Sequence, residues 1–153
     1  MKTSKSFRNL LVKEDGGSLV ETCLTLPVLV LMILGAAEFT RVAYTSLEVV
    51  SAAKAGVSYG AETGATTTDT AGITYAAQHD SANLTGLQVT SVSSSFVCSD
   101  GSAATGLNTD CSTSHIEQTL TVQTQMTMDP LIHVPGLPTT YTINGSASQV
   151  CLQ

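Results

Sequence analysis

Apolar and polar positions divide the chain into a long apolar stretch near the N-terminus and a mixed remainder. The run from Leu19 to Ala37 holds 19 residues, and no residue from Thr22 onward in it is charged. As a helix it would be about 29 Å long at roughly 1.5 Å per residue, which is close to the thickness of the hydrocarbon core of a bilayer. This pattern predicts one uncleaved helix that spans a membrane.

The same run has a second interpretation. A cleaved secretory signal also combines a basic start with an apolar segment, and the small residues 35–37 would serve as its cleavage site. That reading gives a Sec-exported soluble or adhesive protein whose signal peptide ends near Ala37. The membrane helix is favoured, because such signals lack the acidic residues and the early proline found here: Glu14, Asp15, Glu21 and Pro27.

Helical periodicity continues beyond the apolar run. From Phe39 onward the first glycine is Gly56, and no proline interrupts the helical segment. Apolar residues fall on one stripe at a 3.6-residue period: Phe39, Val42, Ala43, Val50, Ala53 and Val57. One helix from about Leu19 to Ser58 would be about 60 Å long. The stripe is expected to pack against the protein's own domain; an alternative is that its lower part also packs against neighbouring subunits.

The pattern changes after Gly60. Residues 61–72 are typical of a Thr/Gly/Ala linker, and residues 73–84 of a short helix. Two later segments alternate as strands do, residues 87–98 and 115–128. Their expected inward positions are Leu87, Val89, Val92, Phe96, Ile116, Leu120, Val122 and Met126.

A third strand is expected over residues 139–150, after a loop whose prolines exclude a central strand. The prediction is therefore an α+β fold. A long N-terminal transmembrane helix extends into the periplasm and carries a small head, which has a short helix and an antiparallel sheet of about three to four strands.

Charge is distributed unevenly along the chain, whose net charge is −6. Four of the six basic residues precede the apolar run, whereas from Glu62 onward there are seven acids and no Lys or Arg. This asymmetry predicts an N-terminus in the cytoplasm and a head outside it. Nucleic acid is excluded as a partner, because the head has no cation to place against phosphate. Glu38 and Arg41, three residues apart, are expected to pair at the membrane surface.

Cysteine placement is consistent with export. Cys98 and Cys111 flank a loop between two expected strands, and a disulfide between them would form in an oxidising compartment. Cys151 has no evident mate, and Cys23 lies within the apolar run, where a thiol behaves as a small apolar group. None of the spacings is typical of a zinc site.

No motif predicts catalysis. His79, His115 and His133 are scattered, and the chain lacks a nucleophile elbow, a zinc-protease helix motif and a phosphate-binding loop. The oxygens of Asp100, Asn108 and Asp110 could bind Ca²⁺, but their spacing is not that of a known calcium loop, so a solvated loop is favoured. We expect no enzymatic activity, no metal, no cofactor and no small-molecule substrate.

Three stretches of the sequence share features with a known family. They are residues 16–41 (GGSLVETCLTLPVLVLMILGAAEFTR), residues 51–62 with Gly56 and Tyr59, and the strand, Pro-rich loop and closing strand over residues 119–150. Together they resemble the TadE-like family of pseudopilins, minor components of the tight adherence (Flp-type) branch of type IV pilus machinery. The first stretch is the specific one. Thr22 and the pair Lys54-Ala55 differ from the residues more usual in the family.

The resemblance implies how the N-terminus is processed. A membrane-embedded prepilin peptidase would cut after Gly16 on the cytoplasmic side, which makes Gly17 the new N-terminus and Glu21 the fifth residue. The resemblance further implies that Glu21 neutralises the amine of a neighbouring subunit's Gly17 and so sets the register of packed helices. The alternative is that Glu21 lies solvated among the lipid headgroups.

The expected organisation follows from these interpretations. Residues 1–16 are a cytoplasmic leader, 17–60 the transmembrane and extended helix, and 61–153 the periplasmic or extracellular head. The protein would be a single-pass component of a bacterial inner membrane that takes part in assembling adhesive pili. Its partners would be the prepilin peptidase, other pilins and pseudopilins, the Tad secretion machinery and membrane lipid.

Overall fold

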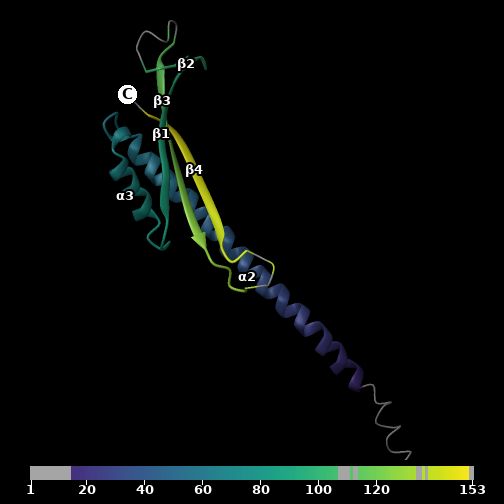
Figure 1. Cartoon of the computed structure of the whole chain (residues 1–153). Helices are drawn as coiled ribbons and strands as arrows, with labels where there is room; N and C mark the ends of the chain where they lie inside the picture. The colour runs from purple at the N-terminus through teal and green to yellow at the C-terminus, as the bar shows by residue number, and fades with distance from the viewer. Residues whose placement is uncertain (1–14, 107–110, 112–113, 134–135, 137, 152–153) are drawn as a thin grey trace, which may run out of the picture. The chain divides into compact units, whose positions relative to one another are not determined.

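The computed structural model describes residues 15–106, 111, 114–133, 136 and 138–151. A long helix, a short helix and a four-stranded antiparallel sheet follow one another along the chain, so the α+β prediction is confirmed (Figure 1). The chain forms two compact units, of which the first ends at Thr40 and the second begins at Arg41.

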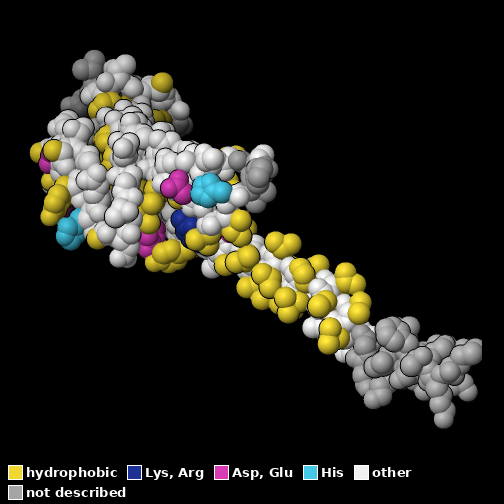
Figure 2. Space-filling view, turned by 60° about the horizontal axis from the view of Figure 1, so that its bottom comes forward, with side chains coloured by type: hydrophobic (Ala, Val, Ile, Leu, Met, Phe, Trp, Pro, Cys, Tyr) yellow, Lys and Arg dark blue, Asp and Glu magenta, His cyan; other side chains and the backbone are white. Residues whose placement is uncertain are grey.

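Helix α2, Asp15–Gly60, is 46 residues long and continues through Pro27. The predicted long helix is therefore confirmed, with an earlier start and a slightly later end. In the first unit residues 17–37 are all exposed, and Figure 2 shows many hydrophobic side chains along the visible face of this part of the helix. An apolar helix with no protein around it needs another apolar environment, since its exposed surface would be costly in water.

The second unit begins with the end of α2 and continues into two short helical segments. These are a 3-10 turn, η1 (Thr66–Thr68), and helix α3 (Thr70–Asp80). The prediction that the linker reaches residue 72 is wrong, because Asp69 caps α3 by accepting a hydrogen bond from the Gly72 backbone N–H at 3.0 Å. An N-cap carboxylate satisfies a helix donor that otherwise has no partner, so the helix starts earlier than its apolar positions indicate.

The sheet has the order β2-β1-β3-β4, and its neighbouring strands are antiparallel. Strands β1 (Gln88–Cys98), β3 (Ile116–Met128) and β4 (Tyr141–Cys151) confirm the three predicted strands within two residues. Strand β2 (Ala103–Ala104) lies inside the expected loop and was not predicted. It pairs with Phe96 and Val97 of β1.

The spacing of inward residues on β1 has a physical cause. Val89 and Val92 are three positions apart, yet both pack against the same core. The register of β1 against β3 shifts between Val89 and Ser91, which leaves an extra residue, Thr90, in β1. A bulge of this kind reverses the side-chain alternation beyond it, so both valines reach one face.

The core of the second unit lies between the helices and one face of the sheet. Ile73 of α3 and Leu120 and Val122 of β3 are fully buried together with Val57 of α2, and Figure 1 shows both helices along the same side of the sheet. A second cluster surrounds Val49 of α2. The expected inward positions Leu120 and Val122 are thus confirmed.

The predicted helix stripe is only partly correct. Ala53 and Val57 are buried, but Phe39 is 75% exposed and Ala43 is exposed as well. The buried face instead includes Val49 and other positions on the helix: Thr45, Ala52 and Ala61. The difference arises because the face of α2 that the sheet covers begins with Thr45. A polar residue at that position is not part of an apolar pattern, although its side chain is buried.

One close contact determines how α2 packs on the sheet. The Thr124 hydroxyl donates to the Val49 carbonyl at 2.8 Å. Gly145, paired with Thr124 across β3 and β4, lies below the same carbonyl, and a Cβ there would be 2.8 Å from the Val49 oxygen. Because backbone atoms cannot rotate away, the helix approaches this closely only over a glycine.

We therefore expect Gly145→Ala to lower the free energy of unfolding by roughly 1 to 3 kcal/mol, the usual effect of overfilling a packed core. Gly64→Ala is the matched control, since a Cβ at Gly64 meets no atom within 4 Å. Urea unfolding of the detergent-solubilised full chain measures both variants. Equal midpoints for the two variants would show that the contact does not constrain the helix.

Candidate functional site

The proposed processing residues lie at the very beginning of α2. Gly16 and Gly17 are its second and third residues, and no atom lies within 4 Å of the position that a Cβ on Gly17 would occupy. Gly35 and Ala37, the alternative signal-peptide site, lie in the helix interior.

Glu21 lies one helical turn after Gly17 and on the same face. Its side chain is exposed, and among the residues that the structure describes no hydrogen bond or ion pair reaches its carboxylate. Only its backbone carbonyl is engaged, by the Thr25 hydroxyl at 3.0 Å. An exposed acid at the edge of an apolar run is the feature on which the predicted contact with another subunit depends.

The first unit is suited to a lipid environment. The helix Gly17–Gly60 is long and apolar enough to cross a membrane, and the apolar window within it has no buried residue. Polar side chains there are satisfied locally, since the Thr22 hydroxyl donates to the Ser18 carbonyl at 2.8 Å. Such bonds let hydroxyls enter hydrocarbon at low cost. Thr22 is compatible with this environment for that reason, and Cys23 is exposed beside it.

The N-terminal helix matches a known family model. Residues 16–58 match the model described as TadE: TadE-like protein. Residues 16–58 form a TadE-like domain. The match starts at the first of the two glycines and includes Glu21, the apolar run and most of α2. The TadE-like family is pilin-type and is not known to be enzymatic.

The TadE-like domain ends before the head. Its last matched residue is Ser58, so the resemblance drawn from residues 119–150 stays a prediction. Neither the curated proteins nor the solved structures contain a significant match to the chain.

Arg41, the first residue of the second unit, holds the loop after β3. Its guanidinium donates to the Asp129 carbonyl at 2.9 Å, across 88 residues of sequence. The predicted pairing of Arg41 with Glu38 crosses the boundary between the units and stays a prediction. The contact with Asp129 was not predicted, because it depends on the tertiary fold and no local spacing indicates it.

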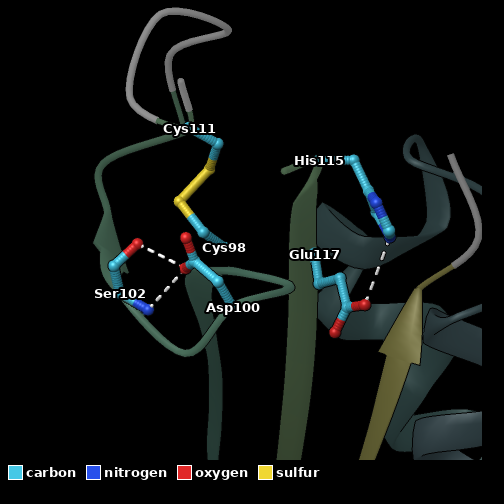
Figure 3. Close-up of a disulfide and its surroundings, with 6 residues drawn as sticks. All are labelled: Cys98, Asp100, Ser102, Cys111, His115 and Glu117. Carbon is cyan, nitrogen blue, oxygen red and sulfur yellow. Dashed lines mark hydrogen bonds and ion pairs between the residues drawn. A yellow bond between two sulfur atoms is a disulfide. The ribbon is translucent and has the colours of Figure 1, made fainter. Parts of the chain in front are cut away.

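The predicted disulfide is present at one end of the sheet. Cys98 and Cys111 are joined with a Cα–Cα distance of 5.7 Å, and Figure 3 shows the bridge beside Asp100. Asp100 Oδ1 accepts from the Ser102 hydroxyl at 2.6 Å and from its backbone N–H at 2.9 Å. These bonds lower the pKa of Asp100. Its carboxylate thus organises the turn before β2, while Asn108 and Asp110, the other residues weighed as calcium ligands, lie outside the described residues.

Reduction of the Cys98–Cys111 bridge is expected to destabilise the head. Cys111→Ser should lower the free energy of unfolding by about 2 to 4 kcal/mol, because the bridge restricts the unfolded chain. Cys23→Ser, which changes an exposed thiol in the first unit, is the control and should have no effect on the head. Non-reducing digestion should yield one cross-linked peptide pair. Recovery of alkylated Cys98 and Cys111 from native exported protein would contradict the bridge.

The remaining cysteine and the histidines have structural surroundings. Cys151 is buried in the core, where the Thr67 hydroxyl lies 3.8 Å from its sulfur. His115 Nε2 is 3.3 Å from Glu117 Oε1 on an exposed surface. His133 is exposed, and the ring of His79 lies 5.5 Å from that of Tyr75. Within the described part of the chain no three metal-binding side chains gather.

A shallow surface groove lies between α2 and α3. It has a volume of about 680 Å³ and includes Tyr59, Asp69, Tyr75 and His79 in its lining. The Tyr59 hydroxyl donates to Asp69 Oδ2 at 3.0 Å, which raises the pKa of Tyr59. The Gly72 N–H and then the Tyr59 hydroxyl lower the pKa of Asp69. Asp69 Oδ1 therefore caps α3, and Oδ2 links the start of α3 to Tyr59 of α2.

The lowered pKa of Asp69 predicts how the stability of the head depends on pH. The Asp69 cap contributes its stability above the ordinary pKa of an aspartate and loses it as the pH falls through the lower folded-state value. The Tyr59–Asp69 pair was not predicted, because it depends on the packing of α3 against α2, although an aspartate three residues before Gly72 is a recognisable N-cap signal.

Proposed function

We propose that the protein is a minor pseudopilin that takes part in assembling a Tad-type adhesive pilus and acts by packing. The observation that carries the proposal is the TadE-like domain at residues 16–58, which joins a glycine pair, an exposed Glu21 and a bare apolar helix in one segment. A membrane anchor supplies lipid for the apolar surface, and a neighbouring subunit supplies a partner for the acid.

Processing is the first step of this proposal. A prepilin peptidase removes residues 1–16, after which Gly17 carries a free amine in the cytoplasmic leaflet. The glycine pair at the start of the TadE-like domain supports this cut site. Small residues also let the extended backbone enter a protease groove. The basic residues before the apolar run keep this end in the cytoplasm, and the head lies on the other side.

Assembly is the second step. The Glu21 carboxylate of one subunit accepts from the amine at Gly17 of another, which offsets the paired helices by about four residues, or roughly 6 Å. Burying the acid alone is unfavourable in hydrocarbon, whereas the pair compensates its charge. The carboxylate thereby favours one register of subunits over others.

The mature N-terminus tests the proposal directly. The full chain is purified from the membranes of cells that carry the Tad system, and its N-terminus is read by chemical sequencing. A start at Gly17 supports the pseudopilin, whereas a start at Glu38 supports the Sec-exported alternative. An intact Met1 in the presence of the peptidase would leave a single-span anchor without pilin processing.

A further inference from the structure

The face of the sheet turned away from the helices carries polar side chains without charge. Both helices of the head lie along the other side, where the core residues of β3 are buried (Figure 1). From Thr119 to Thr127 on β3 and from Thr142 to Ser148 on β4, every outward position is a threonine, serine, glutamine or asparagine. Charged residues belong mostly to protein surfaces, and this part of the surface has none. The open face, as we call these outward positions, therefore offers hydrogen-bonding groups alone.

A depression with a volume of about 570 Å³ lies on the open face. Gln123 is paired with Ser146, and Gln125 with Asn144, so the opposed side chains stand beside one another with Cβ atoms about 5 Å apart. All four residues line the depression, together with Thr90 at the bulge of β1, whose hydroxyl donates to the Gln123 carbonyl at 3.3 Å. Bulges often adjoin functional sites, because they redirect side chains. The depression thus lies where the regular ladder of the sheet is interrupted.

The amides of this depression are not occupied by the protein. Among the described residues no hydrogen bond reaches the side-chain amides of Gln123, Gln125 and Asn144. The next cross-strand pair differs, since the hydroxyls of Thr121 and Ser148 lie 3.0 Å apart and bond each other. A side-chain amide has two donor hydrogens and an acceptor oxygen. Three of them together suit a ligand that presents donors and acceptors in close succession.

A neutral carbohydrate has this chemistry, because each of its hydroxyl groups both donates and accepts. An anionic ligand would find no cation here, since no Lys or Arg follows Lys54 in the chain. An apolar ligand needs a mostly apolar lining, which amides and hydroxyls do not supply. A peptide that adds a strand pairs with backbone groups at a sheet edge, whereas a sheet face offers side chains only.

We propose that the depression around Gln123, Gln125 and Asn144 is a binding site for a neutral glycan. The three amides hold sugar hydroxyls, and Thr90 bounds the site at the bulge. The proposal goes beyond pilus assembly and does not depend on N-terminal processing, because every residue that it uses lies in the head. A head with this site attaches to surfaces coated with uncharged polysaccharide.

Binding to immobilised oligosaccharides of glucose, galactose, mannose and N-acetylglucosamine tests the site. The full chain is measured by biolayer interferometry in a polyoxyethylene detergent, which has no sugar headgroup to compete. We expect saturable binding to a member of this set. Gln125→Ala and Asn144→Ala should each weaken it about three- to tenfold, the usual effect of losing one hydrogen bond. Asn83→Ala, which removes an exposed amide after α3, is the matched control and should bind like the unaltered chain.

Absence of binding to every neutral oligosaccharide would overturn the proposal, as would binding only to polygalacturonate, an anionic glycan included for comparison. Binding that Gln125→Ala and Asn144→Ala leave unchanged would place the sugar elsewhere and reject the site. If no glycan binds and the two variants dissociate a complex of the unaltered chain in sedimentation velocity, a second copy covers the open face instead. These outcomes are independent of a start at Gly17, so the glycan site and the pseudopilin proposal fail separately.

Discussion

A Gly16→Leu variant is expected to keep residues 1–16 in cells that trim the unaltered protein. The cut requires an extended backbone in the peptidase groove, and a branched side chain at the residue before the bond obstructs it. The effect should be a nearly complete loss of trimming, because the second glycine lies on the other side of the bond. Mass spectrometry of the membrane-purified chain measures the fraction that retains the leader.

Gly35→Leu is the matched control. A Cβ at Gly35 meets no atom within 4 Å, so the helix tolerates the change, and trimming at Gly16 should be normal. Under the signal-peptide alternative the outcome reverses, since Gly35 belongs to the small residues that such a site requires. A Gly35→Leu chain that stays full length beside a normally cut Gly16→Leu chain would reject the pseudopilin interpretation.

Periodicity was sufficient to predict most elements of the fold. The apolar run and the alternation around Leu120 and Val122 are local signals, and the structure contains the corresponding helix and strand. Strand β2 was missed because two alanines carry no pattern; their pairing with Phe96 depends on the loop that the disulfide closes. The start of α3 differs from the prediction because a polar cap, Asp69, sets it, whereas the first apolar position of the helix is Ile73.

In the candidate site, too, contacts between residues close in sequence could be predicted, whereas contacts that depend on tertiary packing could not. Gly17 and Glu21 are adjacent on one helix face, so sequence alone places them together. The contact of Arg41 with Asp129 joins residues 88 apart, and only the packed sheet brings them together. The buried face of α2 likewise depends on Gly145, whose missing side chain lets the helix approach β4. Contacts of this kind follow from tertiary packing, which no local period encodes.

Glu21→Gln is expected to insert and mature normally but to fail in assembly. Glutamine keeps the size of the side chain and its hydrogen-bonding oxygen while removing the charge, so entry into the membrane becomes easier. The amine of a neighbouring Gly17 is then left without a counter-charge. Removing one partner of a buried ion pair costs about 3 to 5 kcal/mol, enough to disfavour the staggered helix pair at each interface.

Three measurements on the same cells separate these steps: the amount of protein in the membrane, its mature N-terminus, and its co-purification with other pilins. Glu62→Gln is the control, since it removes the same charge from an exposed position outside the apolar run. We expect the control to assemble, and Glu21→Gln to lose co-purification with the first two quantities unchanged. Normal co-purification of Glu21→Gln would place the carboxylate among the headgroups, where water and lipid satisfy it and no neighbouring amine is needed.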